Sequence, residues 1–138
     1  MNEEVTIAIQ DGEKEKNFVI QKMNAFQAES WLTRAGLLLD REAVNVNDFK
    51  SMSEIVTALC RLNYNEAKPL LDELLSCCFV KSGKYKKQIS ENMPELISSP
   101  LTLMRLRVES FKANFAFLAS GGSFASLVEQ VSAPTATA

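Results

Sequence analysis

The fold depends most on the stretch "SPLTLMRLRVESFKANFAFLASGG", which runs from Ser99 to Gly122. A serine followed by proline is a strong start for a helix, and two consecutive glycines are a strong stop. The stretch therefore predicts a helix of about twenty residues and roughly 30 Å. It is the longest element that this sequence predicts.

This predicted helix has two apolar faces. At about 100° per residue, one set of side chains falls within an arc of about 100° and forms the expected core face. That set comprises Leu101, Met104, Val108, Phe111, Phe115 and Leu118. A second set lies on nearly the opposite side: Leu103, Leu106, Ala113 and Phe117. Either the helix is packed on both sides within one small domain, or its second face is a protein-binding groove or an oligomer interface.

The N-terminal stretch "VTIAIQDGEKEKNFVIQ" alternates apolar and polar residues on both sides of a turn, which predicts a half-buried β-hairpin. A loop from Asp11 to Lys14 places Val5 opposite Ile20 and Ile7 opposite Phe18. A two-residue turn at the Asp-Gly pair would instead place a lysine opposite an isoleucine. Cross-strand apolar pairs favour the longer loop.

Three shorter helices are predicted between the hairpin and the long helix. Asn24 caps the first, "NAFQAESWLTRAGLLLD", through its side-chain oxygen. The second begins at the pair Ser51 and Glu54, whose spacing is that of a capping box. The third has Pro69 in its first turn and ends near Val80.

The first of these helices carries large apolar side chains close to the hairpin. Phe26, Trp31 and Leu32 follow Phe18 and Ile20 after only a short turn. We therefore expect these three residues to close the core against the hairpin, and their role to be structural.

The stretch "KSGKYKKQISENMPELISS" is interpreted as a connection that holds a short turn of helix from Met93 to Ile97. Four lysines make it locally basic: Lys81, Lys84, Lys86 and Lys87. They are consistent either with a solvated loop or with a patch for an acidic partner surface.

One hairpin followed by four or five helices is the predicted architecture, a mainly α fold with a small N-terminal β-hairpin (α+β). With 138 residues and no internal repeat, the chain fits a single compact domain. We expect that domain to span residues 1–131. The small, polar residues 132–138 have nothing to bury and are expected to form a disordered tail.

The composition argues against several partners. A net charge of −2 argues against nucleic-acid binding, because that binding needs clustered lysine and arginine. The apolar stretches are shorter than the roughly 20 residues that a membrane span needs. The acidic start "MNEEV" lacks the basic region of a signal peptide, so we expect a cytosolic protein.

The residue types also argue against catalysis. The chain has no histidine, which excludes Ser/His/Asp and Cys/His sites. Its cysteines, Cys60, Cys77 and Cys78, lack metal-binding spacing and are expected to be buried, reduced thiols. No paired carboxylates and no phosphate-binding glycine motif occur. We therefore expect no enzymatic activity, no cofactor and no metal.

The order of the elements resembles that of the small tail assembly chaperones of long-tailed bacteriophages and prophages. Three stretches carry this resemblance: "FVIQKMNAFQAESWLTRAGLLL", "KPLLDELLSC" and "LTLMRLRVESFKANFAFL". It covers residues 17–117. The resemblance implies a largely helical protein that acts in the host cytoplasm, is absent from the virion, and binds the tape measure protein before the tail tube polymerises. In the family, a frameshifted longer form often recruits tube subunits, and a loose C-terminal tail would suit such a junction.

A long helical client needs an apolar covering surface and no chemistry. The large apolar residues left over once the first face is buried are the predicted binding residues: Leu106, Phe117, Phe124 and Leu127. The alternative function is a cytosolic helical adaptor or regulatory domain with a single folded partner. A weak helical DNA-binding domain is the third hypothesis.

Overall fold

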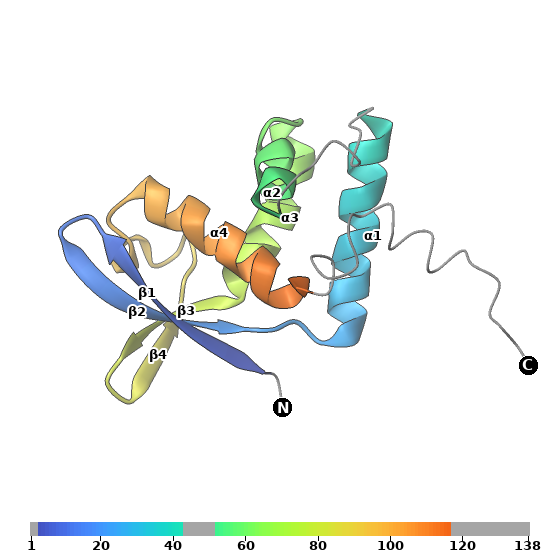
Figure 1. The fold of residues 1–138 in the computed structure, drawn as a ribbon. Coiled ribbons are helices and arrows are strands. Elements are labelled where there is room, and N and C mark those ends of the chain that lie inside the picture. Colours follow the sequence, from blue (N-terminus) through green and yellow to red (C-terminus); the bar gives the residue numbers. More distant parts are fainter. Residues whose placement is uncertain (1–2, 43–51, 117–138) are drawn as a thin grey trace, which may run out of the picture.

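Two β-hairpins and four α-helices make up the part of the chain that the structure describes. The computed structural model describes residues 3–42 and 52–116 (Figure 1). In chain order the elements are β1 (Glu4–Asp11), β2 (Lys14–Gln21), α1 (Ala25–Arg41), α2 (Met52–Cys60), α3 (Tyr64–Ser76), β3 (Cys78–Ser82), β4 (Tyr85–Gln88), the 3₁₀ turn η2 (Pro94–Leu96) and α4 (Pro100–Asn114). The expected tail, residues 132–138, lies outside the described residues.

The four strands form one antiparallel sheet in the order β1-β2-β3-β4. The protein is therefore a small α+β fold, and the predicted mainly α fold with a small hairpin is wrong. The helical count of that prediction is close, but it lacks half of the sheet. The missing half lies in the two stretches that follow α3.

The first hairpin has the predicted register. Val5 lies opposite Ile20 and Ile7 lies opposite Phe18. The strands extend further than expected, so that only two residues, Gly12 and Glu13, form the turn. Gly12 has a φ of 64°, a conformation that glycine adopts without steric cost. The apolar cross-strand pairs were therefore the correct guide to this register.

The second hairpin differs from the sequence prediction. The predicted third helix would continue to Val80, but α3 ends at Ser76 and the chain enters β3. This strand pairs with β2, with Cys78 opposite Ile20. Gly83, with a φ of 60°, makes the turn into β4. The lysine-rich stretch is thus a strand pair, and only its last part, the turn η2, matches the predicted helical turn.

The helix starts are better predicted than the helix ends. Asn24 caps α1, because its side-chain oxygen accepts a hydrogen bond of 2.8 Å from the Gln27 amide. Ser99 caps α4 in the same manner. However, α3 begins at Tyr64, so Pro69 lies inside the helix and not in its first turn. The long helix predicted to run to the paired glycines is wrong in length, because α4 ends at Asn114 after 15 residues; the glycines themselves lie outside the described residues.

The core has two parts, with α4 between them. The helical cluster is formed by buried residues of α1, α2, α3 and α4: Trp31, Ala35, Leu38, Leu39, Ile55, Val56, Leu59, Ala67, Leu70, Leu74, Phe111 and Phe115. The sheet cluster lies between α4, the end of α3 and the sheet: Ile9, Phe18, Ile20, Leu75, Cys77, Cys78, Ile89 and Leu106. Residues of both predicted apolar faces are therefore packed within one fold, Phe111 and Phe115 in the helical cluster and Leu106 in the sheet cluster, whereas Leu101 of the first face is exposed.

Trp31 is buried as predicted, but against other partners. Its ring stacks on Phe115 at 5.2 Å and lies 5.5 Å from Phe111, and its indole N–H donates to the Leu70 carbonyl at 2.8 Å. These partners belong to α3 and to the α4 region, so Trp31 does not close the core against the hairpin. Phe26 is 88% exposed, and its predicted core role is wrong.

A buried carboxylate fastens the first hairpin to the start of α4. Asp11, 1% exposed, accepts hydrogen bonds from the Lys16 ammonium at 2.7 Å, from the Ser98 and Ser99 amides, and from the Thr102 hydroxyl at 2.9 Å. Burial alone would raise the pKa of Asp11, but these hydrogen bonds outweigh it and hold the pKa below its ordinary value. We call this group of contacts the Asp11 latch.

Candidate interaction surfaces

The four predicted binding residues do not form an exposed surface in the described structure. Leu106 is fully buried in the sheet cluster, so it offers no surface to a partner in this conformation. Phe117, Phe124 and Leu127 lie outside the described residues. For these three, partner binding stays a prediction.

The outer face of α1 exposes two large apolar side chains. Phe26 is 88% exposed and Leu37 is 66% exposed. They are eleven residues apart, so they lie within about 20° of each other around the helix and about 16 Å apart along it. Ser30 and Thr33, both exposed, lie between them on this face. We call these four residues the α1 outer face.

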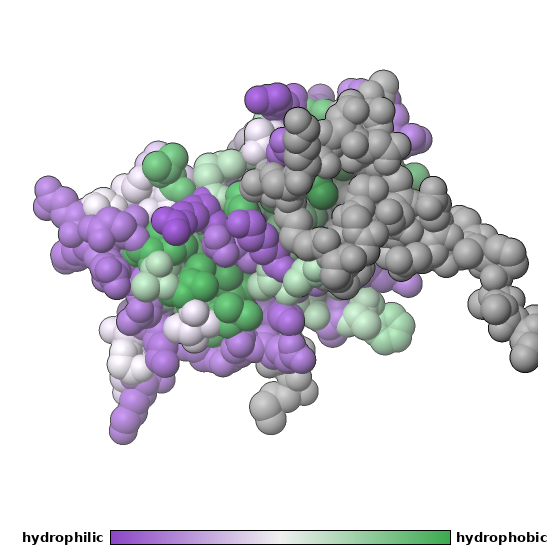
Figure 2. All heavy atoms as spheres, viewed as in Figure 1, coloured by the Kyte–Doolittle hydropathy of each residue, from purple (hydrophilic) through white to green (hydrophobic). Residues whose placement is uncertain are grey.

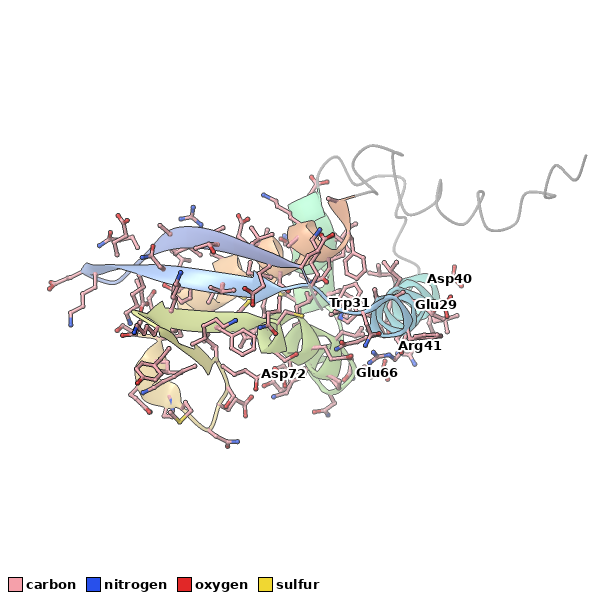
Figure 3. All side chains as sticks on the ribbon, turned by 90° about the horizontal axis from the view of Figure 1, so that it is seen from below. Glu29, Trp31, Asp40, Arg41, Glu66 and Asp72 are labelled. Atoms are coloured by element: carbon pink, nitrogen blue, oxygen red, sulfur yellow. The ribbon has the colours of Figure 1, made fainter. Side chains whose placement is uncertain are left out.

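Two acidic side chains flank the α1 outer face. In Figure 3 Glu29 and Asp40 extend from α1 on the side away from the rest of the fold. Neither carboxylate forms an ion pair with a described residue. A basic side chain of a partner could therefore reach them without displacing an existing contact.

The opposite side of α1 is firmly held. Trp31 lies in the helical cluster, Arg34 forms two hydrogen bonds with Glu73 of α3, and Arg41 pairs with Glu66 of α3. Figure 3 shows Arg41 and Glu66 next to each other at the junction of the two helices. The α1 outer face is therefore presented on a helix whose position is fixed by side-chain contacts.

The two edges of the sheet differ in chemistry. The short edge strand β4 and its turn carry Lys84, Lys86 and Lys87, whereas β1 carries no lysine and no proline. Lys86 pairs with Glu4 at 2.6 Å and lies over the Phe79 ring, while the other two form no ion pair with a described residue. Lysines on an edge strand hinder pairing with another strand. The β4 edge is protected in this sense, and the β1 edge is not.

An apolar band accompanies the β1 edge. Figure 2 shows hydrophobic side chains on the surface in the region of α4 and β1. Val5 is 36% exposed, and Ile7 and Leu103 are partly buried against the sheet cluster. This surface therefore combines a strand edge with apolar side chains.

The groups in the described residues that bear on chemistry are potential metal ligands and thiols. Within residues 3–42 and 52–116, no group of three potential metal ligands occurs, and no helix could cross a membrane. Burial raises the pKa of the Cys77 thiol, and that of Cys78 to about 12, so both are held as thiols at neutral pH. Cys60 is exposed, in contrast to the expected burial.

Comparison with protein families, with curated proteins and with solved structures finds no match for this chain.

The sequence contained a signal for the α1 outer face. Phe26 and Leu37 fall outside the apolar stripe that recurs along α1, and the 11-residue spacing between them places them on one face. An apolar residue off the main stripe of a helix is a candidate for exposure. The β1 edge has no such signal, because strand order cannot be read from one strand.

Proposed function

We propose that this chain is a noncatalytic tail assembly chaperone of a long-tailed bacteriophage or prophage. It binds the tape measure protein in the host cytoplasm before the tail tube polymerises, and it is absent from the mature virion. The resemblance of three sequence stretches within residues 17–117 supports this proposal, with the hairpin of β3 and β4 as an addition to the expected order of elements. The observation that carries it is the α1 outer face, where Phe26 and Leu37 are exposed on one firmly held helix.

The α1 outer face fits an amphipathic helix of the client. The two anchors are about 16 Å apart, which matches three turns of an α-helix. A client helix with apolar residues at that spacing would cover both anchors at once. Full burial of one such side chain contributes about 1.5–3 kcal/mol. Two anchors therefore support binding that is reversible, as handover of the client to the tube requires.

The flanking carboxylates favour basic client helices. Glu29 and Asp40 have no described ionic partner, so client helices with lysine or arginine beside the apolar stripe would be favoured. The contribution of such exposed pairs is about 0–1 kcal/mol each and falls with salt. Affinity thus comes from the apolar anchors, and the carboxylates orient the client.

Co-expression with the tape measure protein from the same genome tests the proposal. The client should become more soluble and should copurify with this chain. Replacing both anchors, Phe26→Ser with Leu37→Ser, should reduce copurification about tenfold or more, because two buried apolar contacts are lost. The proposal fails if the tape measure protein is equally soluble without this chain and never copurifies with it.

A matched control removes similar apolar surface elsewhere. Tyr64 is 67% exposed at the start of α3 and Leu101 is 78% exposed at the start of α4. The double variant Tyr64→Ser with Leu101→Ser should bind the client like the wild type. If both double variants lose the client equally, the α1 outer face is not the specific site.

The longer form is tested in the nucleotide sequence. A slippery heptamer before the stop codon, with an overlapping downstream frame, would support a frameshifted product that recruits tube subunits. If this chain binds one folded cytosolic partner and leaves tape measure solubility unchanged, the adaptor function replaces the chaperone function.

A further inference from the structure

The outer edge of β1 carries a row of backbone hydrogen-bonding groups that no described strand pairs with. The Lys22 amide donates to the Glu3 carbonyl at 2.8 Å. Residue 3 and every second residue after it therefore direct their backbone N–H and C=O groups toward β2. The intervening residues therefore direct their N–H and C=O groups away from the sheet. These residues are Glu4, Thr6, Ala8 and Gln10, and no described backbone group bonds to them.

The β1 edge is also free of the features that prevent strand pairing. It is eight residues long and carries neither lysine nor proline. Its helix-side residues Val5 and Ile7 are partly exposed, and Ile7 packs against the sheet cluster, as does Leu103 of α4. A strand added here would gain main-chain hydrogen bonds and would also cover apolar side chains.

The charges along β1 favour a second copy of the same strand as the occupant. The carboxylates of β1 itself and of the preceding residue each have a lysine of their own chain as partner: Glu3 with Lys22 at 2.8 Å, Glu4 with Lys86 at 2.6 Å and Asp11 with Lys16 at 2.7 Å. Two copies of β1 can therefore meet without unpaired like charges. Two β4 edges would instead bring lysines together, which disfavours pairing.

We infer that β1 pairs antiparallel with β1 of a second copy of this chain, so that two four-stranded sheets form one continuous sheet across a twofold axis. One register uses all four outward-facing residues: Thr6 pairs with Ala8 of the second copy, and Glu4 pairs with Gln10. In that register Ile7 meets its own copy at the axis, and Val5 faces Ile9. The interface is isologous, as expected for a symmetric dimer. This inference does not rest on the proposed function.

Sedimentation velocity over a concentration series tests the pairing. The wild type should shift from monomer to dimer as concentration rises. Ala8→Pro removes an N–H that points away from β2, so the first hairpin keeps its own hydrogen bonds. This variant should raise the dimer dissociation constant about tenfold or more, because the loss occurs twice across the axis.

Two matched variants locate the effect. Ala8→Val keeps the N–H and should associate like the wild type. Gln88→Pro makes the same backbone change on the outward side of β4, the other edge, and should also associate like the wild type. A chain that stays monomeric at all concentrations would overturn the inference. So would a dimer that Ala8→Pro leaves intact.

A disulfide trap covers the case in which Ala8→Pro does not fold. In a Cys60→Ser background, Ile7→Cys should form a covalent dimer on mild oxidation, because the two side chains face each other at the axis. Lys87→Cys on β4 should remain monomeric under the same conditions. Absence of the Ile7→Cys cross-link, or equal cross-linking of both variants, contradicts the proposed pairing.

Discussion

The helical cluster and the sheet cluster share α4, but they are closed in different ways. On the helical side the rings of Trp31, Phe111 and Phe115 meet at centroid distances of 5.0–5.5 Å. On the sheet side a buried, ionised Asp11 fastens the hairpin turn to α4 through hydrogen bonds. The helical side presents side chains to the solvent, at the α1 outer face, whereas the sheet side presents backbone groups at a strand edge.

This difference predicts different responses to conditions. Apolar packing depends little on pH, whereas a buried carboxylate with a lowered pKa makes stability depend on protonation. The two sides should also differ in which substitutions remove binding. Side-chain substitution should remove binding on the helical side, and loss of a backbone N–H should remove it on the sheet side.

The largest expected effect is on the helical side. Trp31→Ala should lower the free energy of unfolding by about 3–5 kcal/mol, because it leaves a large cavity between α1, α3 and α4. It also leaves the buried Leu70 carbonyl without its indole donor. Denaturant unfolding followed by circular dichroism measures this loss, which should be the same at pH 7 and at about pH 4. A loss below about 1 kcal/mol would contradict the central position of Trp31.

The next largest effect on stability is expected at the Asp11 latch. Asp11→Asn should cost about 2–4 kcal/mol at neutral pH, because an amide loses the charge that strengthens four hydrogen bonds. The same unfolding experiment measures this loss. Lys14→Asn, at an exposed position across the same turn, is the control and should change stability by less than about 0.5 kcal/mol.

The latch should also make stability depend on pH. The folded-state pKa of Asp11 is lowered, so its contribution is complete above the unfolded-state pKa of about 4 and declines as pH falls through that value toward the folded pKa. The stability difference between the wild type and Asp11→Asn should therefore narrow below about pH 4. A difference that stays constant down to about pH 2 would show that the charge of Asp11 is not what stabilises the latch.

The smallest expected effect is at the partly exposed ion pair that joins α1 to α3. Arg34 and Glu73 contact each other at 2.8 Å, but the arginine side chain is 42% exposed. Arg34→Met should cost about 0–1 kcal/mol, because water competes for both charges. Thermal unfolding at low and high salt checks this value. A loss as large as that of Trp31→Ala would mean that the helical side is held by charge and not by packing.

Part of this fold was predictable because local pattern and tertiary pairing agree. The first hairpin is one such case, since only one register pairs Ile7 with Phe18. The caps at Asn24 and Ser99 are others, because capping depends on a few neighbouring residues.

The second hairpin was not predictable in this way. The apolar residues at the start of β3 directly follow α3, and a short apolar run fits either a helix or a strand. The lysines of β4 give no apolar alternation, because all four residues of β4 are exposed. The strand forms because β2 offers an edge that lies about sixty residues earlier in the chain, and local sequence does not encode that contact.

The candidate surfaces also depend on contacts that are distant in sequence. Exposure of Phe26 depends on how α1 is rotated against α3, and the contacts that fix this rotation are distant in sequence. Leu106 was chosen as a leftover apolar residue, but the sheet covers it. With only one hairpin predicted, the sequence lacked the surface that buries Leu106.

The connection from β2 to β3 has a consequence for the order of folding. The Gln21 amide donates to the Cys77 carbonyl at 2.8 Å, so the path through α1, α2 and α3 leaves the sheet and returns to the same point. The two outer strand pairs close across turns of two residues, whereas the central pair must enclose roughly 55 residues. Pairing of β2 with β3 therefore has the largest loop-closure entropy cost in the sheet. We expect the hairpins and helices to form early from local contacts, and the joining of β2 to β3 to limit the folding rate.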